Sequence, residues 1–510
     1  MNSQMRVDAI VIGAGLGGLL SAAQLLQLGK QVVVLERLPH SGGRFTAKSF
    51  HGVQVSTGAV HMVPFGSSGV LASTLSRLHV PYRFFDADVF GSFHVHGKFY
   101  RSRGILGVYK FLGPRQFFWF SRLGYLMFLR PLPPAEQHIP FIAWLRRHIN
   151  VERNPQLVAF FERISRFALS LELDQVSTAE VIRTTKNMLR FGAPAIVEGG
   201  CSSVTHALEQ LIRAQGGNMY LSCEVLQILQ EDNAATGVRI RDKASGEEHM
   251  IYAPLIVSDI GPRATDGLLH NHKVTQAEVL KQRGAMEANG SIYATSVIAS
   301  SASDETAGNA EPREAVGLKV HVLSDVSLIP HKGIMYCLDT QRIAGIVQPT
   351  NSDPSLAPAG KHLLISHQVI QSDDIAEERA LALADLRFLF GETFDTHCRV
   401  LTMGTYRGEW PVNRMAQGED VSAETSLPGL YLVGDAVKPA GYLMVEGVAQ
   451  SVNTVFDLLY KKEQAARLND RQTGSTLGTT AHRSNYIVGL PSSLNALRWL
   501  WKAPGNAGKM

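Results

Sequence analysis

Glycines cluster in two short stretches, one near each end of the 510-residue chain, and both have the pattern of a nucleotide-binding turn. The first stretch is Gly13-Ala14-Gly15-Leu16-Gly17-Gly18. Gly13 permits a tight turn, Gly15 lets the backbone approach a pyrophosphate, and Gly18 lets a helix pack closely on a strand. The first amides of that helix would face the phosphates. These residue types at this spacing indicate a dinucleotide site.

The elements that must position these glycines occur in the order such a site needs. Residues 7–12 are an apolar run suited to a buried parallel strand, and 19–28 continue as a helix that Gly29 ends. A second strand follows at 31–35, and Glu36 stands at its end, where a carboxylate can bind a ribose hydroxyl. The alternative is a glycine-rich turn that binds nothing.

A glycine and arginine segment follows Glu36 directly and bears on which dinucleotide is bound. Arg37, Gly43 and Arg44 come first, and Gly58 and Ala59 follow. The Arg44 guanidinium offers a planar fork of donors for a phosphate or a flavin edge, although it could also be an ordinary surface arginine. The arrangement resembles the second glycine-arginine segment of the FAD-binding amine oxidase and phytoene desaturase superfamily, which nicotinamide dehydrogenases lack.

The distal stretch is Gly429-Leu-Tyr-Leu-Val-Gly434-Asp435. Residues 430–433 suit a strand, Gly434 permits a close turn, and Asp435 can accept from a ribityl hydroxyl, hold the pyrophosphate environment or cap a helix. A helix should follow from the segment 441–452, which contains Glu446, Gly447 and Val448. The resemblance implies that the positive end of this helix lies under the flavin and stabilises the reduced ring.

Further segments resemble the same superfamily in the same order. Residues 353–362, Asp-Pro-Ser-Leu-Ala-Pro-Ala-Gly-Lys-His, are similar to a connection in phytoene desaturases, carotenoid isomerases and retinol saturases, and 194–200, 223–228 and 253–259 resemble the second part of their nucleotide-binding domain. Ser56 stands where desaturases often have an acidic residue, and the C-terminal element is shorter, which weakens the match to carotene as substrate. The resemblance implies FAD bound by Gly13, Ala14, Gly15, Gly17, Gly18, Glu36, Arg37, Gly43, Arg44, Gly58, Ala59, Val225, Gly434, Asp435, Glu446, Gly447 and Val448.

The expected fold class is α/β, with a discontinuous Rossmann-like FAD-binding domain and an inserted α+β substrate-binding domain. Residues 1–75, 195–295 and 395–460 should form the FAD-binding domain, and 76–194 and 296–394 the substrate domain. The first insertion should be largely helical, with a capping box at 177–180, whereas the second should contain strands near 292–299, 319–323 and 363–369 and a helix over 374–390. Residues 461–510 should form a polar linker and an amphipathic tail.

Composition restricts the class of partner. The formal net charge is only +4 and no lysine- or arginine-rich run is present, so no nucleic acid partner is expected. The four cysteines are widely spaced and none has metal-ligand spacing with histidine, so no metal site is expected. With no signal sequence and no apolar run of about 20 residues, a cytoplasmic protein is predicted.

Two aromatic segments suggest contact with a membrane surface. Residues 117–129 are rich in phenylalanine and flanked by Arg115 and Arg130, and 494–502 combine two tryptophans with basic residues. The alternative is that such aromatic residues belong to a core or line a substrate tunnel. A peripheral position at the membrane is therefore a hypothesis for both segments.

A flavin accepts or donates a hydride at N5, so the protein need only bind a substrate beside it and manage a proton. The resemblance implies an apolar isoprenoid or carotenoid-like substrate that is desaturated, saturated or isomerised at a carbon–carbon double bond, with a quinone, NADPH or another redox partner. Candidate catalytic residues are His61, Tyr442 and Glu446, although a histidine satisfied by a backbone carbonyl is an equal alternative for His61. The competing functions are a flavin amine or protoporphyrinogen oxidase and a binding protein that keeps FAD structurally.

Overall fold

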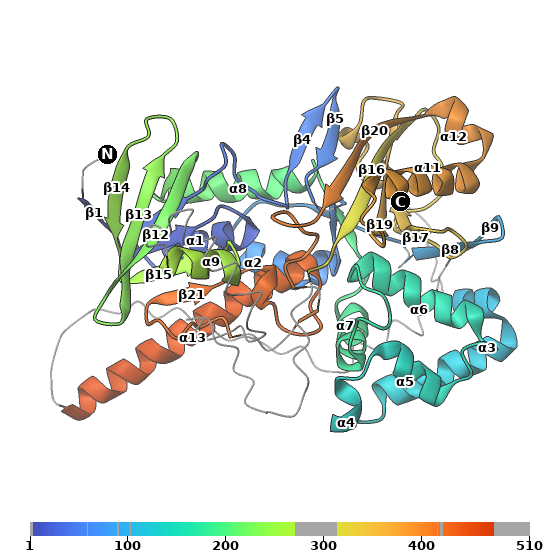
Figure 1. Ribbon diagram of the computed structural model, residues 1–510, viewed down its shortest axis with the longest axis horizontal. Coiled ribbons are helices and arrows are strands. Elements are labelled where there is room, and N and C mark those ends of the chain that lie inside the picture. Colours follow the sequence, from blue (N-terminus) through green and yellow to red (C-terminus); the bar gives the residue numbers. More distant parts are fainter. Residues whose placement is uncertain are drawn as a thin grey trace, which may run out of the picture.

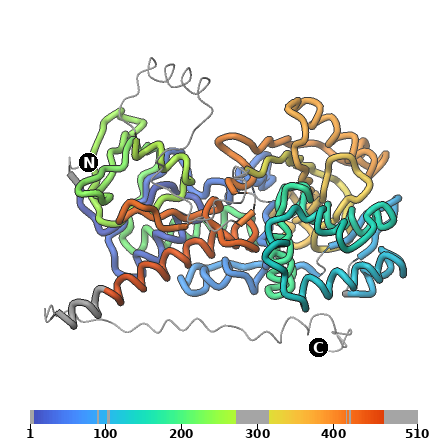
Figure 2. The backbone as a smooth tube through the Cα atoms, turned by 60° about the horizontal axis from the view of Figure 1, so that its bottom comes forward, coloured from blue at the N-terminus to red at the C-terminus, as the bar shows by residue number. Residues whose placement is uncertain are grey.

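The structure is a computed structural model that describes residues 4–58, 60–88, 91–101, 104–270, 314–415, 417–418 and 422–473. Ala59, the strand expected at 292–299 and the aromatic segment 494–502 lie outside the described residues. Two bodies lie side by side along the long axis of the molecule, each built around its own main sheet (Figure 1). Figure 2 shows that segments from distant parts of the sequence interleave within each body.

The first body contains a five-stranded parallel sheet in the order β11-β3-β2-β15-β21. Three separate stretches of the chain supply the strands, as expected for a discontinuous nucleotide-binding domain. They are β2 (Ala9–Ile12), β3 (Val32–Leu35), β11 (Asn218–Tyr220), β15 (Leu255–Ser258) and β21 (Leu430–Leu432). The predicted strands at 7–12 and 31–35 are thus confirmed with slightly shorter bounds.

Each face of this sheet is covered by a different layer. Helices α1 (Leu16–Gln27), α8 (Cys201–Ala214) and α13 (Met444–Thr473) share a buried cluster with Ala9 and Val11 of β2. Ile10 and Ile12, on the opposite side of the same strand, pack against a second sheet in the order β1-β14-β13-β12. Alternate residues of β2 are therefore buried on both faces, which explains its continuous apolar sequence. The second sheet consists of β1 (Gln4–Arg6), β12 (Cys223–Glu231), β13 (Ala234–Asp242) and β14 (Glu248–Tyr252).

The second body contains a seven-stranded sheet in the order β20-β16-β19-β18-β17-β8-β9, antiparallel except for the parallel pair β17 and β8. Its strands are β8 (Gly91–Val95), β9 (Lys98–Arg101), β16 (Gly317–Ser324), β17 (Ile334–Cys337), β18 (Ile343–Val347), β19 (His362–Val369) and β20 (Cys398–Tyr406). The sequence places β20 within the expected FAD-binding stretch 395–460. It pairs with β16 instead, because its partner strand comes from a distant segment that local sequence does not reveal.

Helices cover both faces of the seven-stranded sheet. On one side lie α11 (Ile375–Phe390) and α12 (Glu392–His397), packed on Leu318 and Val320. On the other side lie α3 (Gly104–Phe128) and α6 (Pro155–Ala168), with α4 (Pro134–Gln137), α5 (Phe141–His148) and α7 (Thr178–Phe191) beyond them (Figure 1). The predicted capping box is confirmed in part, because the Ser177 side chain accepts from the Glu180 amide at the start of α7. The expected helical first insertion is present, although it also contributes β8 and β9.

Smaller elements complete the described chain. The hairpin of β4 (Ala47–Phe50) and β5 (Val53–Ser56) projects between the two bodies (Figure 1). A three-stranded sheet is formed by β6 (Met62–Val63), β10 (Ala195–Val197) and β7 (Phe84–Asp86). The remaining helices used below are α2 (Val70–Arg77) and α9 (Pro262–Leu269). No helix within these described ranges is long and apolar enough to cross a membrane.

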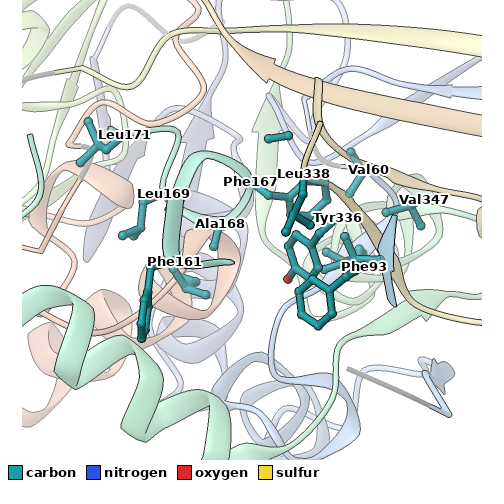
Figure 3. Packing of buried hydrophobic residues seen from close by; sticks show 14 of the residues in the cluster. Val60, Phe93, Phe161, Phe167, Ala168, Leu169, Leu171, Tyr336, Leu338 and Val347 are labelled. Atoms are coloured by element: carbon teal, nitrogen blue, oxygen red, sulfur yellow. The ribbon is translucent and has the colours of Figure 1, made fainter. Parts of the chain in front are cut away.

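Aromatic side chains from β8, β17 and the helical insertion form one buried cluster (Figure 3). The Phe93 ring stacks on Phe111 at 4.8 Å between centroids and on Tyr336 at 5.6 Å. Phe167 meets the edge of Tyr336 at 5.8 Å. Because these rings fill the space between them, a substrate tunnel through this point requires them to move.

Candidate cofactor site and active site

The predicted glycine turn joins β2 to α1. The Gly13 amide donates to the Leu35 carbonyl at 2.8 Å, and the φ of Gly13 is +96°, which favours glycine. A Cβ atom at Gly18 would collide with the Gly13 carbonyl oxygen, so only glycine lets α1 begin this close to the strand. The first turn of α1 therefore points its free amides at the carboxyl end of the sheet.

Glu36 lies at the end of β3, as predicted, and its carboxylate is buried. One oxygen accepts from the Ala14 amide at 2.8 Å and the other from the Leu38 amide at 2.9 Å. The carboxylate thus lies beside the glycine turn, at the position where a ribose hydroxyl would be bound.

The glycine-arginine segment folds back onto the same turn. The Gly42 amide donates to the Ala14 carbonyl at 2.8 Å, and a Cβ atom on Gly43 would contact the Gly15 Cα at 3.4 Å. A Cβ atom on Gly58 would collide with the Arg44 carbonyl oxygen. These close approaches explain the glycines, and they place Arg44 next to the turn.

An ion pair between Arg44 and Asp435 connects the two glycine-rich ends of the chain. Their side chains meet at 2.6 Å, and the other guanidinium nitrogen of Arg44 donates to the Pro411 and Val412 carbonyls, each at 3.1 Å. The Arg414 amide donates to the second Asp435 oxygen at 2.6 Å. Burial acts to raise the pKa of Asp435, but Arg44 and Arg414 outweigh it and hold that pKa well below the usual range. Asp435 is therefore ionised at any ordinary pH.

Asp259 reaches the same point from the end of β15. It lies within the segment 253–259, but sequence analysis did not identify it as a site residue. One carboxylate oxygen accepts from the Gly18 amide at 3.0 Å. Burial raises the pKa of Asp259 to about 7, against the lowering effects of the Gly18 amide and of Arg414.

The glycines form a cradle around the Asp259 carboxylate. Cβ atoms at Gly15, Gly17 and Gly434 would lie 2.5, 2.5 and 2.6 Å from its oxygens. A negatively charged group therefore fits at the start of α1, and the bare glycines leave room for it. This cradle, together with Glu36 and Arg44, fits the pyrophosphate and ribose of FAD, provided that Asp259 moves away or is protonated.

Three expected cofactor residues on the distal segment lie in α13. A Cβ atom on Gly447 would meet the Lys438 Cβ at 2.8 Å, and Val448 packs against the cluster beneath the parallel sheet. Glu446 accepts from the Phe65 amide at 3.2 Å and the Leu71 amide at 2.9 Å, and burial raises its pKa to about 7. Both Glu446 oxygens thus bind the backbone around the start of α2, which favours a positioning role.

Two other expected cofactor residues lie at the edges of this region. Val225 is part of β12, two residues after Cys223, whose amide donates to the Glu36 carbonyl at 2.8 Å. Arg37 lies at the surface, where it pairs loosely with Glu409 at 3.4 Å. Val225 therefore lies close to Glu36 along the chain path, whereas the partner of Arg37 in the described part of the chain is exposed.

His61 is fully buried, and backbone groups engage both of its ring nitrogens. Its Nε2 lies 2.7 Å from the Gln54 carbonyl and its Nδ1 accepts from the Cys201 amide at 3.2 Å, at the start of α8. Burial lowers the pKa of His61 to about 4, so the ring is neutral near pH 7. This geometry favours a histidine that holds α8 in place. Tyr442, in contrast, is half-buried, and its hydroxyl makes no hydrogen bond within the described part of the chain.

Lys319 was missed by sequence analysis. It lies in β16, is 5% exposed, and places its ammonium 4.8 Å from the centre of the Tyr406 ring. Burial lowers the pKa of Lys319 to about 7. The signal was a lysine within the apolar run 317–323, where a charge is unusual.

A cavity of about 490 Å³ opens at the surface beside the glycine-arginine segment. Its wall includes Ser56, whose hydroxyl lies 3.0 Å from the Nε2 of the buried His321. The lining residues are Leu38, His40, Lys48, Val55, Ser56, Thr57 and Trp410. Because Thr57 precedes Gly58, the cavity lies next to the glycine-arginine segment.

The two bodies, each built around its own main sheet, have the fold of FAD-dependent oxidoreductases. The model of the family of flavin containing amine oxidoreductases matches residues 16–452, and the chain belongs to that family. The protein is thus a FAD-dependent oxidoreductase within the phytoene desaturase-like grouping.

Individual relatives cover most of the chain. An uncharacterized protein of Methanocaldococcus jannaschii is 30% identical over 461 residues, covering 88% of this chain and 98% of the relative. A neurosporene-forming phytoene desaturase of Cereibacter sphaeroides is 28% identical over 399 residues, covering 69% and 71%. The crystal structure of an oxidoreductase from Methanosarcina mazei superimposes with a TM-score of 0.73 at 32% identity, covering 89% of this chain and all of that one.

The Arg44 and Asp435 ion pair should stabilise the folded chain. Asp435→Asn leaves the largely buried guanidinium without its charged partner and should lower the free energy of unfolding by about 3 kcal/mol. In Arg44→Met/Asp435→Asn the loss should be smaller than the sum of the two single losses. Denaturant unfolding without FAD measures the losses in Asp435→Asn, in Arg44→Met and in the double variant. Asp325→Asn is the matched control, because its partner Lys361 is solvent-exposed and the change should cost less than about 1 kcal/mol. Strictly additive losses would show that the two charges do not interact.

The protonation of Asp259 should control FAD affinity. The folded pKa of about 7 exceeds the unfolded pKa of about 4, so Asp259 stabilises the fold at low pH and this contribution is lost as pH rises through 7. Above pH 7 its carboxylate also opposes the pyrophosphate. FAD affinity, measured by flavin fluorescence from pH 5.5 to 8.5, should fall with pH in the wild type and stay nearly constant in Asp259→Asn. Parallel pH profiles for the two proteins would be incompatible with this assignment.

Proposed function

We propose that this flavoenzyme acts on carbon–carbon double bonds of an apolar isoprenoid or carotenoid-like substrate. The observation that carries the proposal is the apolar and aromatic cluster on the face of the seven-stranded sheet that also bears Lys319. Its members come from both bodies, including Val60 and Leu443 next to the cofactor segments and Phe93 and Tyr336 of the substrate body. The similarity to the phytoene desaturase of Cereibacter sphaeroides supports the same class of substrate.

Bound FAD supplies hydride transfer at its N5 atom. The residues of the chain then have three tasks. The first turn of α13 presents its positive end, which favours negative charge on a reduced ring. Lys319, with a pKa near 7, is suited to release or take up a proton at its ammonium. The Tyr442 hydroxyl makes no hydrogen bond to a described residue and is therefore suited to bind substrate, whereas His61 and Glu446 position α8 and α2.

The experiment for this function follows the redox state of the flavin. The purified protein with bound FAD is photoreduced without oxygen and mixed with a polyene or with a quinone. Reoxidation by the polyene indicates saturation, and reoxidation by the quinone indicates that the enzyme desaturates its substrate and passes the electrons on. A flavin that stays reduced with both reagents would identify a structural cofactor. In a separate mixture, reduction of the oxidised flavin by an amine, followed by reoxidation only by oxygen, would identify an amine oxidase.

We also infer that α3 rests on a membrane surface. The second part of the helix exposes Phe118 and Tyr125 by 63% and 58%, and Leu129, directly after the helix, is 74% exposed. Their spacing places the three side chains on one side. The Arg122 guanidinium lies 5.3 Å from the centre of the Trp119 ring on the same part of the helix. Exposed aromatic residues beside basic ones suit the interface of an anionic bilayer. The redox partner would then be reached in the membrane or at its surface.

Flotation with liposomes tests this contact. The protein should float with vesicles that contain anionic lipid. Phe118→Ser/Leu129→Ser should shift most of the protein to the soluble fraction, because these large apolar side chains no longer enter the interface. Phe388→Ser is the control, since Phe388 is 58% exposed on α11, away from α3. If all of the wild-type protein stays soluble, α3 does not bind membranes.

A further inference from the structure

Two basic side chains face each other on the inner side of the seven-stranded sheet. Lys319 of β16 lies directly opposite His367 of β19 in the antiparallel register. Residues that alternate with them, such as Leu318, point to the other side and pack under α11. The pair therefore lies on the side of the sheet that carries the apolar and aromatic cluster.

Each of the two side chains has a nitrogen atom without a hydrogen-bond partner among the described residues. Within the described residues, the Lys319 ammonium makes no hydrogen bond and pairs with no carboxylate, and its polar contact is the face of the Tyr406 ring. His367 is 3% exposed, and its Nε2 lies 2.8 Å from the Ser170 hydroxyl. Its Nδ1 is buried and makes no hydrogen bond of normal geometry to any described residue.

The Lys319 ammonium and the His367 Nδ1 atom destabilise the folded chain when they have no partner. A buried polar group without a partner costs about 1–3 kcal/mol, and a buried charge costs more. The groups that face Lys319 are the Cys201 thiol and the Arg44 guanidinium, and neither is a carboxylate. The Arg166 carbonyl lies beside the His367 ring but outside normal hydrogen-bond geometry for Nδ1. The missing partner is thus an atom with lone pairs.

The pair also lies next to the cofactor segments. A Cβ atom at Gly317 would lie 2.7 Å from the His367 ring and 3.0 Å from the Val412 side chain. The Val412 carbonyl accepts a hydrogen bond from Arg44. A ligand atom held by Lys319 and His367 would therefore be near FAD as well as near the apolar cluster.

We propose that Lys319 Nζ and His367 Nδ1 together bind one oxygen atom of the substrate, which makes the substrate an oxygenated isoprenoid, an alcohol or a carbonyl compound, and not a hydrocarbon. The inference rests on the proposed isoprenoid function and narrows its substrate class. Lys319 donates to the oxygen. Burial and the nearby Lys319 lower the pKa of His367 to about 3, so its ring is neutral. Nδ1 then accepts from a hydroxyl, or donates to a carbonyl in the other tautomer. A hydrocarbon would leave the Lys319 ammonium and the His367 Nδ1 atom without a partner.

The test compares three probes with the same carbon chain: geranylgeraniol, geranylgeranial, and the hydrocarbon with a methyl group in place of the oxygen function. Each is titrated into the FAD-loaded protein at a fixed detergent concentration, and binding is followed by the flavin absorption. The alcohol or the aldehyde should bind at least about tenfold more tightly than the hydrocarbon, equivalent to about 1.4 kcal/mol. Tight binding of the alcohol alone indicates that Nδ1 accepts, and of the aldehyde alone that it donates.

Variants then assign the preference to the two residues. Lys319→Met and His367→Leu should each reduce the preference for the oxygenated probe to less than about threefold, with little change in hydrocarbon affinity. Lys332→Met, which removes an exposed lysine of the same sheet region, should leave it unchanged. Equal binding of all three probes to the wild type, or an unchanged preference in both variants, overturns the inference while the isoprenoid function stands. If none of the probes binds, the isoprenoid function fails and this inference fails with it.

Discussion

The ion pair between Arg44 and Asp435 is the contact on which the cofactor site depends, because it joins side chains that are 391 residues apart in sequence. Each partner is also fixed by its own backbone. Arg44 donates to the carbonyls of the loop at 411–412, and Asp435 accepts from the Arg414 amide. The loop between β20 and β21 is thereby held against the glycine-arginine segment. Since β20 belongs to the seven-stranded sheet and β21 to the parallel sheet, the same contact sets how the two bodies meet.

Charge is distributed unevenly around this contact. Positive charge comes from the start of α1 and from the Arg44 and Arg414 side chains. The carboxylates of Asp435 and Asp259 interact with these positive groups. Asp435 is ionised because it has two cationic neighbours. The pKa of Asp259 is about 7 because the effect of burial dominates. One carboxylate can thus be a permanent part of the fold while the other yields its place to a phosphate. On the substrate side, no carboxylate among the described residues pairs with Lys319. The cofactor half therefore suits a phosphate group, and the substrate half suits an oxygen atom that accepts from the Lys319 ammonium.

The cofactor half was predictable from sequence because steric contact dictates it locally. Gly13, Gly18 and Gly58 lie where a side chain would strain the turn or strike backbone, and Glu36 follows its strand at a fixed distance. The substrate half was not predictable in the same way. Lys319 and His367 become neighbours through the register of two strands that are more than forty residues apart, and Asp259 becomes a site residue only because β15 lies beside β2. The grouping of β20 with the FAD-binding stretch failed for the same reason, since strand pairing is not local. The positions of His61 and Glu446 in their motifs favour catalytic roles, but their hydrogen bonds favour scaffolding.

A crystal structure of the protein with FAD bound tests the central claim most directly. The pyrophosphate should lie against the first turn of α1, in the cradle of Gly15, Gly17 and Gly434, with the Asp259 carboxylate displaced from the Gly18 amide and the Arg44 and Asp435 pair intact. The flavin ring should lie between that pair and Lys319. A pyrophosphate bound elsewhere, or an Arg44 side chain that leaves Asp435 when FAD binds, would contradict the proposed organisation of the site.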